Sequence, residues 1–320
     1  MKERVLVLAG PTACGKSDLA VQVCKRLNGE VVSADSMQIY REMRIGTARP
    51  TEAEMQGVPH HLLGFWPLEK PFSVSDYVAL AARTIAQITA RGRPSRLPVL
   101  TGGTGLYIRS LLSGLTFAGE GVNEALRQSL FAFAQAHGPE SLHQRLSQID
   151  PEAAAKIHPH NLKRVVRALE IYETTGKTPT QAAREALPEA PPYDACFQVL
   201  QFRNRETLYR RIDARVDKML ADGLLEEARH VFSLSAGETA RQAIGHKELL
   251  PYLAGTCTLS QAVEEMKRAT RRYAKRQLTW FRREKDAQPL FVDDFPTPQA
   301  LLEEVLHRVQ THWKGSFVCI

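Results

Sequence analysis

The chain has 320 residues, of which 43% are hydrophobic and 24% are charged, and its formal net charge is +7. This length suits one large domain or two, and the hydrophobic fraction indicates an ordinary globular chain with a packed core. Its five cysteines are odd in number and lack paired C-x-x-C spacing, which argues against a disulfide framework and a structural zinc site. No apolar run approaches the ~20 residues needed to span a membrane, so we expect a cytoplasmic protein without a signal peptide. The positive charge favours a polyanionic partner without requiring one.

The first elements predict a loop that binds a phosphate chain. The apolar run Val5–Leu8 predicts a strand, and Ser17–Leu27 predicts a helix. Glycines in the connecting G-x-x-x-x-G-K-S pattern let backbone N–H groups point at one anion, and the start of the helix adds positive potential. We expect Lys16 to reach the terminal phosphates and the Ser17 hydroxyl to bind Mg²⁺. The phosphate loop consists of Gly10, Pro11, Thr12, Ala13, Cys14, Gly15, Lys16 and Ser17.

The next elements predict a parallel α/β sheet. Glu30–Asp35 predicts a second strand that ends in a carboxylate, and Ser75–Ala90 predicts a helix. Leu97–Leu100 predicts a third strand, which is followed by Thr101 and a glycine-rich turn. Ligands of such sheets collect at the carboxyl ends of the strands. We therefore expect the phosphate loop, Asp35 and Thr101 to meet at one crevice.

Each strand-end residue has two possible roles at this point. Asp35 either binds magnesium through water or acts as a base. Thr101 is either a cap or turn residue or a member of the functional site. Nucleoside triphosphatases and kinases usually offer a further strand that ends in aspartate, whereas Leu97–Leu100 is followed by Thr101. That difference weakens an ATPase assignment.

The second half of the chain predicts a helical insertion and a return to the sheet. Strand signals are absent from about Gly119 to Pro192, where helices are predicted to begin near Asn123, Asp150 and Asn161. The later predicted elements are a strand at Phe197–Phe202, helices at Leu208–Phe232 and Ser260–Arg283, a strand at Pro289–Val292, and a final helix capped by Thr297. This order predicts an α/β core of residues 1–118 and 198–320 with a helical insertion at residues 119–197.

A basic segment, Lys267–Lys285, contains nine Lys or Arg residues and one Glu. At helical spacing Met266, Tyr273, Gln277 and Trp280 can form a buried stripe flanked by cations. Such a helix suits contact with a nucleic-acid backbone, and a solvated helix with extended cationic side chains is the alternative.

Six segments together resemble the bacterial tRNA dimethylallyltransferases, also called tRNA isopentenyltransferases, of the IPP transferase family. They occur in the family's order and span nearly the whole chain. The segments are GPTACGKS at 10–17, DSMQIY at 35–40, GGTGLY at 102–107, RVVRALE at 164–170, IGHKE at 244–248 and YAKRQLTWFR at 273–282. The resemblance implies a parallel sheet like that of P-loop NTPases, flanked by helices, with an inserted all-helical domain that contacts the tRNA anticodon stem-loop.

The resemblance also implies the reaction. A dimethylallyl group would pass from dimethylallyl diphosphate to N6 of the adenosine on the 3′ side of certain anticodons, with release of diphosphate and a requirement for Mg²⁺. The phosphate loop would hold the diphosphate of the prenyl donor rather than ATP. Asp35 would be the general base, and Thr101 would donate a hydrogen bond to the diphosphate or its bridging oxygen. The target base would leave the anticodon-loop stack to enter the site.

The residues that the resemblance assigns to tRNA binding fall in four groups. Asn123, at the start of the insertion, is a further candidate for tRNA binding, but a role as the N-cap of a helix would explain this residue equally well. The chain departs from the family pattern at Cys14, where Ser is usual, at His160-Asn161, where Asn-Asp is common, and at His246, where Tyr is usual. No paired Cys/His spacing like that of the eukaryotic relatives' zinc finger occurs after Trp280, so we do not expect such a finger. We expect a monomer that does not bind membranes. The four groups are Asp35, Ser36, Met37, Gln38 and Thr101; Pro159, His160, Asn161, Leu162 and Lys163; Arg241, Gln242, Ala243, Ile244, Gly245 and His246; and Lys275, Arg276, Gln277, Thr279, Trp280 and Arg282.

Two other classes of function remain open on the sequence. One is a small-molecule P-loop kinase or a prenyltransferase acting on free adenylate. The other is a basic RNA-binding NTPase or adaptor without transfer chemistry. The adenylate alternative leaves the helical insertion and the basic segment unexplained, and an adaptor needs neither Asp35 nor Thr101.

Overall fold

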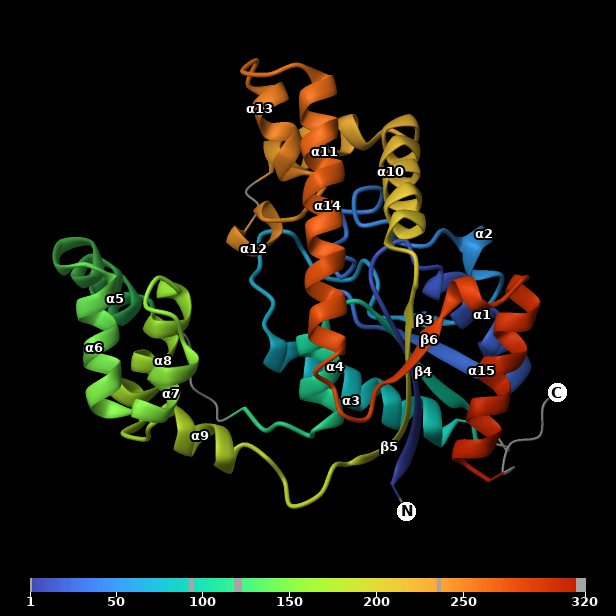
Figure 1. Ribbon diagram of the computed structural model, residues 1–320, viewed down its shortest axis with the longest axis horizontal. Coiled ribbons are helices and arrows are strands. Elements are labelled where there is room, and N and C mark those ends of the chain that lie inside the picture. The colour runs from blue at the N-terminus through green and yellow to red at the C-terminus, as the bar shows by residue number, and fades with distance from the viewer. Residues whose placement is uncertain (1, 92–94, 118–122, 235–236, 315–320) are drawn as a thin grey trace. The chain divides into compact units, whose positions relative to one another are not determined.

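The computed structural model describes residues 2–91, 95–117, 123–234 and 237–314, whose elements are labelled in Figure 1. The chain divides into two compact units, unit 1 with Met1–Leu112 and Pro192–Ile320 and unit 2 with Ser113–Pro191. Unit 2 ends before the predicted insertion does, because the strand that returns the chain to unit 1 begins at Tyr193 rather than at Phe197. The predicted first boundary, between residues 118 and 119, lies outside the described residues.

Unit 1 contains a six-stranded sheet in which every neighbouring pair is parallel. Its strand order is β3-β2-β4-β1-β5-β6. The strand β1, which precedes the phosphate loop, therefore lies beside β4, which ends with Thr101 and Gly102. The α/β fold with a parallel sheet is confirmed, and the two-residue β3 was not predicted. The strands are β1 (Glu3–Ala9), β2 (Gly29–Ser33), β3 (His60–His61), β4 (Leu97–Gly102), β5 (Tyr193–Gln201) and β6 (Gln288–Phe291).

The longer helices of unit 1 follow the predicted order, whereas α2, α4, α12 and α13 were not predicted. The predicted helix Leu208–Phe232 is wrong as a single element, since Gly223 adopts a φ of +100° and divides it into α10 and α11. Thr297 caps the final helix as predicted, by accepting a hydrogen bond from the Ala300 N–H at 3.1 Å. The helices are α1 (Lys16–Leu27), α2 (Glu52–Met55), α3 (Val74–Ala90), α4 (Gly105–Leu112), α10 (Arg205–Ala221), α11 (Leu224–Ser233), α12 (Glu238–Arg241), α13 (Leu250–Leu253), α14 (Leu259–Phe281) and α15 (Pro298–His312), with short 3₁₀ turns η1 (Lys247–Leu249) and η2 (Val292–Asp294).

The two faces of the sheet bury alternate side chains of each strand. Leu6 and Leu8 of β1 belong to a core that includes residues of α1 and α15. Val5 and Val7 belong to a second core, which includes residues of α3 and α4. All four side chains are fully buried, and each such side chain contributes about 1.5–3 kcal/mol to stability. Helices on both faces explain why β1 is a continuous apolar run rather than an alternating one.

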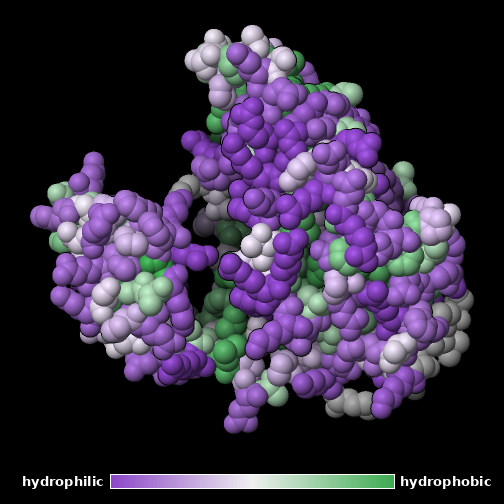
Figure 2. Space-filling view, viewed as in Figure 1, coloured by the Kyte–Doolittle hydropathy of each residue, from purple (hydrophilic) through white to green (hydrophobic). Residues whose placement is uncertain are grey.

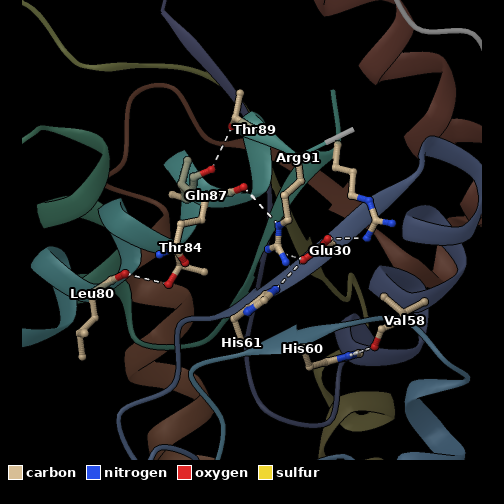
Figure 3. Close-up of polar contacts among 11 residues, drawn as sticks. Glu30, Val58, His60, His61, Leu80, Thr84, Gln87, Thr89 and Arg91 are labelled. Atoms are coloured by element: carbon tan, nitrogen blue, oxygen red, sulfur yellow. Dashed lines mark hydrogen bonds and ion pairs between the residues drawn. The ribbon is translucent and has the colours of Figure 1, made fainter. Parts of the chain in front are cut away.

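A buried carboxylate joins the edge of the sheet to the end of α3. Glu30 is fully buried, and its oxygens pair with His61 at 2.6 Å, Arg91 at 3.0 Å and Arg96 at 2.6 Å. Figure 3 shows the side chains of His61 and Arg91 converging on Glu30. Burial raises the pKa of this carboxyl, but hydrogen bonds from His61 and Arg96 and the charge of Arg91 outweigh burial and lower it. The ionised carboxylate therefore holds the short strand β3 in place.

Unit 2 is all-helical in its described residues, as predicted. Its core is formed by residues such as Leu142, Leu146, Val165 and Leu169, all fully buried. No helix in the described parts of either unit is both long and apolar enough to cross a membrane. The helices of unit 2 are α5 (Glu124–His137), α6 (Pro139–Ile149), α7 (Pro151–Lys156), α8 (Leu162–Thr175) and α9 (Pro179–Glu185).

Candidate functional site

The pairing of β2 with β4 brings the two strand-end candidates together. Ser33 is the register partner of Thr101, and the Ala34 N–H donates to the Thr101 carbonyl at 2.8 Å. A Cβ added to Gly102 would lie 2.1 Å from the carbonyl oxygen of Ala34, so only glycine permits this approach. Asp35 follows directly on Ala34. The end of β4 is thereby held against the segment that carries the carboxylate.

The phosphate loop curls from β1 into the start of α1. The Lys16 ammonium donates to the carbonyl of Pro11 at 3.1 Å, and Gln277 of α14 accepts the Thr12 N–H at 3.0 Å. Gly15 precedes α1, which begins at Lys16, so the positive end of this helix faces the loop. Five residues of the loop line a cavity: Thr12, Ala13, Gly15, Lys16 and Ser17. The other three, Gly10, Pro11 and Cys14, are buried and do not line it.

That cavity of about 1200 Å³ lies within unit 1 and unites the predicted elements. Lys16 and Ser17 line it from the phosphate loop, Asp35 and Gln38 from the end of β2, and Thr101 from the end of β4. The predicted crevice at the carboxyl ends of these strands is therefore present. A diphosphate bound to the loop would lie in the same space as the carboxylate.

Asp35 has one oxygen engaged and one available. Its Oδ1 accepts the N–H groups of Met37 at 2.9 Å and Gln38 at 3.3 Å, which fixes the carboxylate against its own backbone. Within the described residues no hydrogen bond reaches Oδ2. Burial and the negative charge of Asp35 raise the pKa of the Tyr273 hydroxyl, which lines the same cavity. Oδ2 can accept a proton from a substrate.

Thr101 presents a hydroxyl that lacks a partner. The residue is 7% exposed, and its Oγ1 has no hydrogen-bond partner among the described residues. Leaving a buried hydroxyl unpaired costs about 1–3 kcal/mol, which makes an unpaired group worth explaining. Because Thr101 also lines the cavity, a bound substrate can supply the missing acceptor.

The structure adds two arginines that the sequence analysis did not single out. Arg211 and Arg215 of α10 both line the cavity, and Arg211 Nε donates to the carbonyl of Ala13 at 2.9 Å. Arg215 Nε is buried without a partner among the described residues. Burial lowers the pKa of the Arg215 guanidinium, and the charge of Asp35 opposes that shift. Their i, i+4 spacing on one predicted helix was the available signal.

The residues predicted to bind tRNA in unit 1 divide into those in the cavity and those outside its lining. His246 is fully buried, and its Nε2 pairs with Glu227 at 2.9 Å. Gln277 is also buried, and its Nε2 donates to the Gly103 carbonyl at 2.9 Å. The predicted residues that line the cavity are Asp35, Ser36, Met37, Gln38, Thr101, Gln242, Ala243, Ile244, Gly245, Arg276 and Gln277. Outside its lining, Arg241, Lys275, Thr279 and Arg282 are exposed and Trp280 is half-buried.

The basic segment forms most of α14, which packs beside α10 (Figure 1). Hydrophilic residues dominate the face of unit 1 that carries these two helices (Figure 2). Met266 and Gln277 are buried as the predicted stripe requires, while Tyr273 and Trp280 are half-buried. The helix therefore combines a buried face with an outward-facing row of cations, among them Arg272.

In unit 2, Asn123 caps a helix. Its Oδ1 accepts the Leu126 N–H at 3.0 Å at the start of α5, so the capping explanation accounts for this residue. The predicted segment Pro159–Lys163 leads into α8, and His160, Asn161 and Lys163 are exposed. His160 lies 3.2 Å from Glu140. These side chains lie on the surface of unit 2 at the start of α8.

The protein oxygens in the cavity suit a magnesium ion that is shared with phosphates. Within the described residues no three His, Cys, Asp or Glu side chains lie together as a metal site. Mg²⁺ is commonly held by one or two protein oxygens, several waters and substrate phosphates rather than by an all-protein cage. Ser17 and Asp35 supply oxygens of this kind on the lining of the cavity.

Comparisons with known proteins agree with this geometry. A family model described as IPP transferase matches residues 38–284, and one described as isopentenyl transferase matches residues 3–72. The chain is 43% identical over 308 residues to the tRNA dimethylallyltransferase of Caldanaerobacter subterraneus, covering 95% of this chain and 97% of that protein. It is 48% identical over 282 residues to the tRNA dimethylallyltransferase of Bacillus subtilis, covering 88% of both.

Two solved structures are also similar. The full-length tRNA isopentenylpyrophosphate transferase of Bacillus halodurans has a TM-score of 0.73 at 41% identity, with 98% of each chain covered. A eukaryotic dimethylallyltransferase described as acting on tRNA has a TM-score of 0.81 at 27% identity, with 98% of this chain and 81% of that chain covered. The similarity therefore extends over nearly the whole length of the chain.

Proposed function

Because the chain belongs to the IPP transferase family and is an enzyme of the tRNA dimethylallyltransferase type, we propose that it prenylates an adenosine in tRNA. The dimethylallyl group passes from dimethylallyl diphosphate to N6 of the adenosine on the 3′ side of the anticodon, and diphosphate is released. The proposal is carried by one observation: the phosphate loop and the Asp35 carboxylate line the same cavity.

The loop binds the leaving group of this reaction. Breaking the allylic C–O bond places negative charge on the diphosphate, and groups that neutralise this charge lower the barrier. Lys16, the loop N–H groups and the start of α1 are available for that role, and Arg215 adds a second cation. Thr101 donates its hydroxyl to the diphosphate or its bridging oxygen as charge develops there. This contact satisfies its otherwise unpaired Oγ1.

Magnesium fits the same site. The Ser17 hydroxyl would hold it, together with waters and phosphate oxygens of the donor. When bound, the ion supplies positive charge that stabilises the departing diphosphate.

Asp35 acts on the acceptor. The N6 amino group of adenine is a weak nucleophile because its lone pair is delocalised into the ring. As the N6–C bond forms and the C–O bond breaks, Asp35 Oδ2 takes one N6 proton, which keeps the nitrogen from accumulating positive charge. The atoms balance, since the prenyl group replaces one hydrogen on N6 and diphosphate leaves.

Binding of tRNA precedes this chemistry on a broader surface. The target base leaves the anticodon-loop stack and enters the cavity near Gln38. Lys275 on the exposed side of α14 and Arg282 directly after its end contact the RNA backbone, where cations contribute sequence-independent affinity. In unit 2, the exposed residues of Pro159–Lys163 contact the anticodon stem-loop.

A direct assay tests the proposal. The protein is incubated with dimethylallyl diphosphate, Mg²⁺ and unmodified tRNA that carries adenosine next to the anticodon, and the RNA is analysed by mass. We expect addition of one five-carbon unit to that nucleoside. Transfer of phosphate from ATP with no prenyl addition would favour the kinase alternative, and tRNA binding without any transfer would favour an adaptor.

A further inference from the structure

A buried carboxylate on α11 fixes one wall of the cavity. Glu227 Oε2 accepts the backbone N–H groups of Arg44 at 2.9 Å and Ile45 at 2.6 Å, and Oε1 accepts that of Gly46 at 2.8 Å. The fourth contact of this carboxylate is with His246 Nε2 at 2.9 Å. Only 9% of the Glu227 side chain is exposed, and none of the His246 side chain is. Each oxygen of the Glu227 carboxylate therefore accepts two hydrogen bonds from within the protein.

The contacts keep Glu227 ionised. Burial raises the pKa of its carboxyl, but hydrogen bonds from His246 and from the backbone N–H groups of 44–46 outweigh burial and lower it. An ionised carboxylate can only accept hydrogen bonds, so His246 Nε2 is the donor of their shared bond. Gly46 packs against the imidazole so closely that a Cβ there would lie 2.3 Å from its Cε1. His246 thus braces both the carboxylate and the wall.

The same wall holds the side chain of Gln38. The Gln38 Nε2 donates to the carbonyls of Thr47 at 3.1 Å and Ala48 at 3.2 Å. Ala48 is tied back to the anchored part of the wall, because its N–H donates to the carbonyl of Ile45 at 2.9 Å. Residues 44–48 (the 44–48 wall) therefore link Glu227 to Gln38. Gln38 follows Asp35 by three residues, and its own N–H donates to Oδ1 of that carboxylate.

We propose that Glu227 and His246 are positioning residues for the acceptor nucleoside, which act by holding the 44–48 wall and, through it, the Gln38 amide. This inference rests on the proposed function. The effect is confined to the acceptor side, because no hydrogen bond among the described residues joins the 44–48 wall to the phosphate loop. The sequence analysis predicted that His246 contacts RNA. In this proposal the buried His246 acts on RNA binding indirectly, through the 44–48 wall.

The test separates the two substrates. In Glu227→Gln, either orientation of the new amide turns its NH₂ group toward a backbone N–H that needs an acceptor. We expect kcat/KM for tRNA to fall about tenfold or more, while the Kd of dimethylallyl diphosphate stays within about twofold. Glu226→Gln alters an exposed neighbour on the same helix and is the matched control, with both values unchanged.

A second variant keeps the inference testable if Glu227→Gln does not fold. His246→Phe removes one of the four donors and retains a ring against Gly46. We expect a smaller loss in kcat/KM for tRNA, about threefold or more, again with unchanged donor Kd. The double variant should lose less than the product of the two single losses, because both act through one wall.

Three results overturn the inference. Unchanged tRNA kinetics in both variants would show that the wall does not position the acceptor, and equal losses for tRNA and donor would show a general structural defect. Wild-type protein that leaves tRNA unmodified in the mass assay would refute the proposed function itself, and this inference with it. If the wild-type protein modifies tRNA and both variants have wild-type kinetics, the inference is refuted while the proposed function stands.

Discussion

Gln277, on the basic helix α14, accepts the backbone N–H of Thr12 in the phosphate loop at 3.0 Å. Its Nε2 donates to the carbonyl of Gly103 at 2.9 Å, so one buried amide spans the loop and the turn that follows Thr101. The inner side of α14 thus supports the phosphate loop, while the outer side of the same helix carries the cations proposed to contact RNA. One residue of α14 therefore holds two segments that line or adjoin the proposed donor site.

Replacing Gln277 with leucine is expected to damage both stability and donor binding. Two backbone groups lose their partner, and each unsatisfied buried group costs about 1–3 kcal/mol. We expect a free energy of unfolding lower by about 2–5 kcal/mol and a raised Kd for dimethylallyl diphosphate, measured by denaturant titration and calorimetry. Gln277→Glu keeps the acceptor for Thr12 but faces the Gly103 carbonyl with an oxygen. A leucine variant with wild-type stability would contradict the bridging role.

Thr101→Val is expected to separate activity from stability. The hydroxyl has no partner in the described residues, so removing it at nearly constant volume costs no internal hydrogen bond. We expect unchanged or slightly higher stability with kcat lowered about tenfold to a hundredfold, since the lost donor acts on the developing charge. Thr101→Ser, which keeps a hydroxyl, should retain most activity. Loss of stability without loss of kcat would make Thr101 a structural residue.

Lys16→Ala tests the loop as the donor site. The ammonium already contacts the carbonyl of Pro11 and needs only to turn toward a bound diphosphate. Because a hydrogen bond to a charged group contributes about 1.5–3 kcal/mol, the Kd for dimethylallyl diphosphate should rise roughly tenfold to a hundredfold. The affinity for tRNA, measured by filter binding, should not change. Unaltered donor affinity would move the diphosphate away from this loop.

The Glu30 network makes stability depend on pH. Because its pKa is lowered in the folded protein from an ordinary value of 4.5, this carboxyl stabilises the fold above that pH. The contribution is lost as the pH falls through the lowered value. We expect the stability difference between wild type and Glu30→Gln to be constant near neutral pH and to shrink below about pH 4.5, measured by urea titration. A difference that does not change with pH would show that Glu30 ionisation is not involved.

Much of the fold and the donor site could be predicted from local patterns. The strand, glycine-rich loop and helix at Val5–Leu27 form a contiguous motif, and a carboxylate at the end of a predicted strand has only one edge of the sheet to occupy. Asp35 and Thr101 lie at the same edge of the sheet because they follow and end neighbouring parallel strands. These features need few long-range contacts to be specified.

Features that depend on distant contacts could not be predicted. Helical spacing predicted the burial of Gln277, but its hydrogen-bond partners depend on the approach of α14 to two loops more than 170 residues earlier in the chain. The partner of His246 is a glutamate 19 residues away on another helix. No local pattern identifies these partners, and Gly223 carried the local sign of the break between α10 and α11.

The role of Asp35 as the base is tested most directly by Asp35→Asn in a single-turnover assay with saturating donor, Mg²⁺ and tRNA. Asparagine keeps an oxygen for the N–H groups of Met37 and Gln38 but cannot take a proton at Oδ2. We predict that five-carbon addition to tRNA falls at least about a hundredfold while the Kd values for tRNA and donor remain within about threefold. Addition at the wild-type rate would contradict the account, because the carboxylate opposite the phosphate loop would then have no part in the transfer.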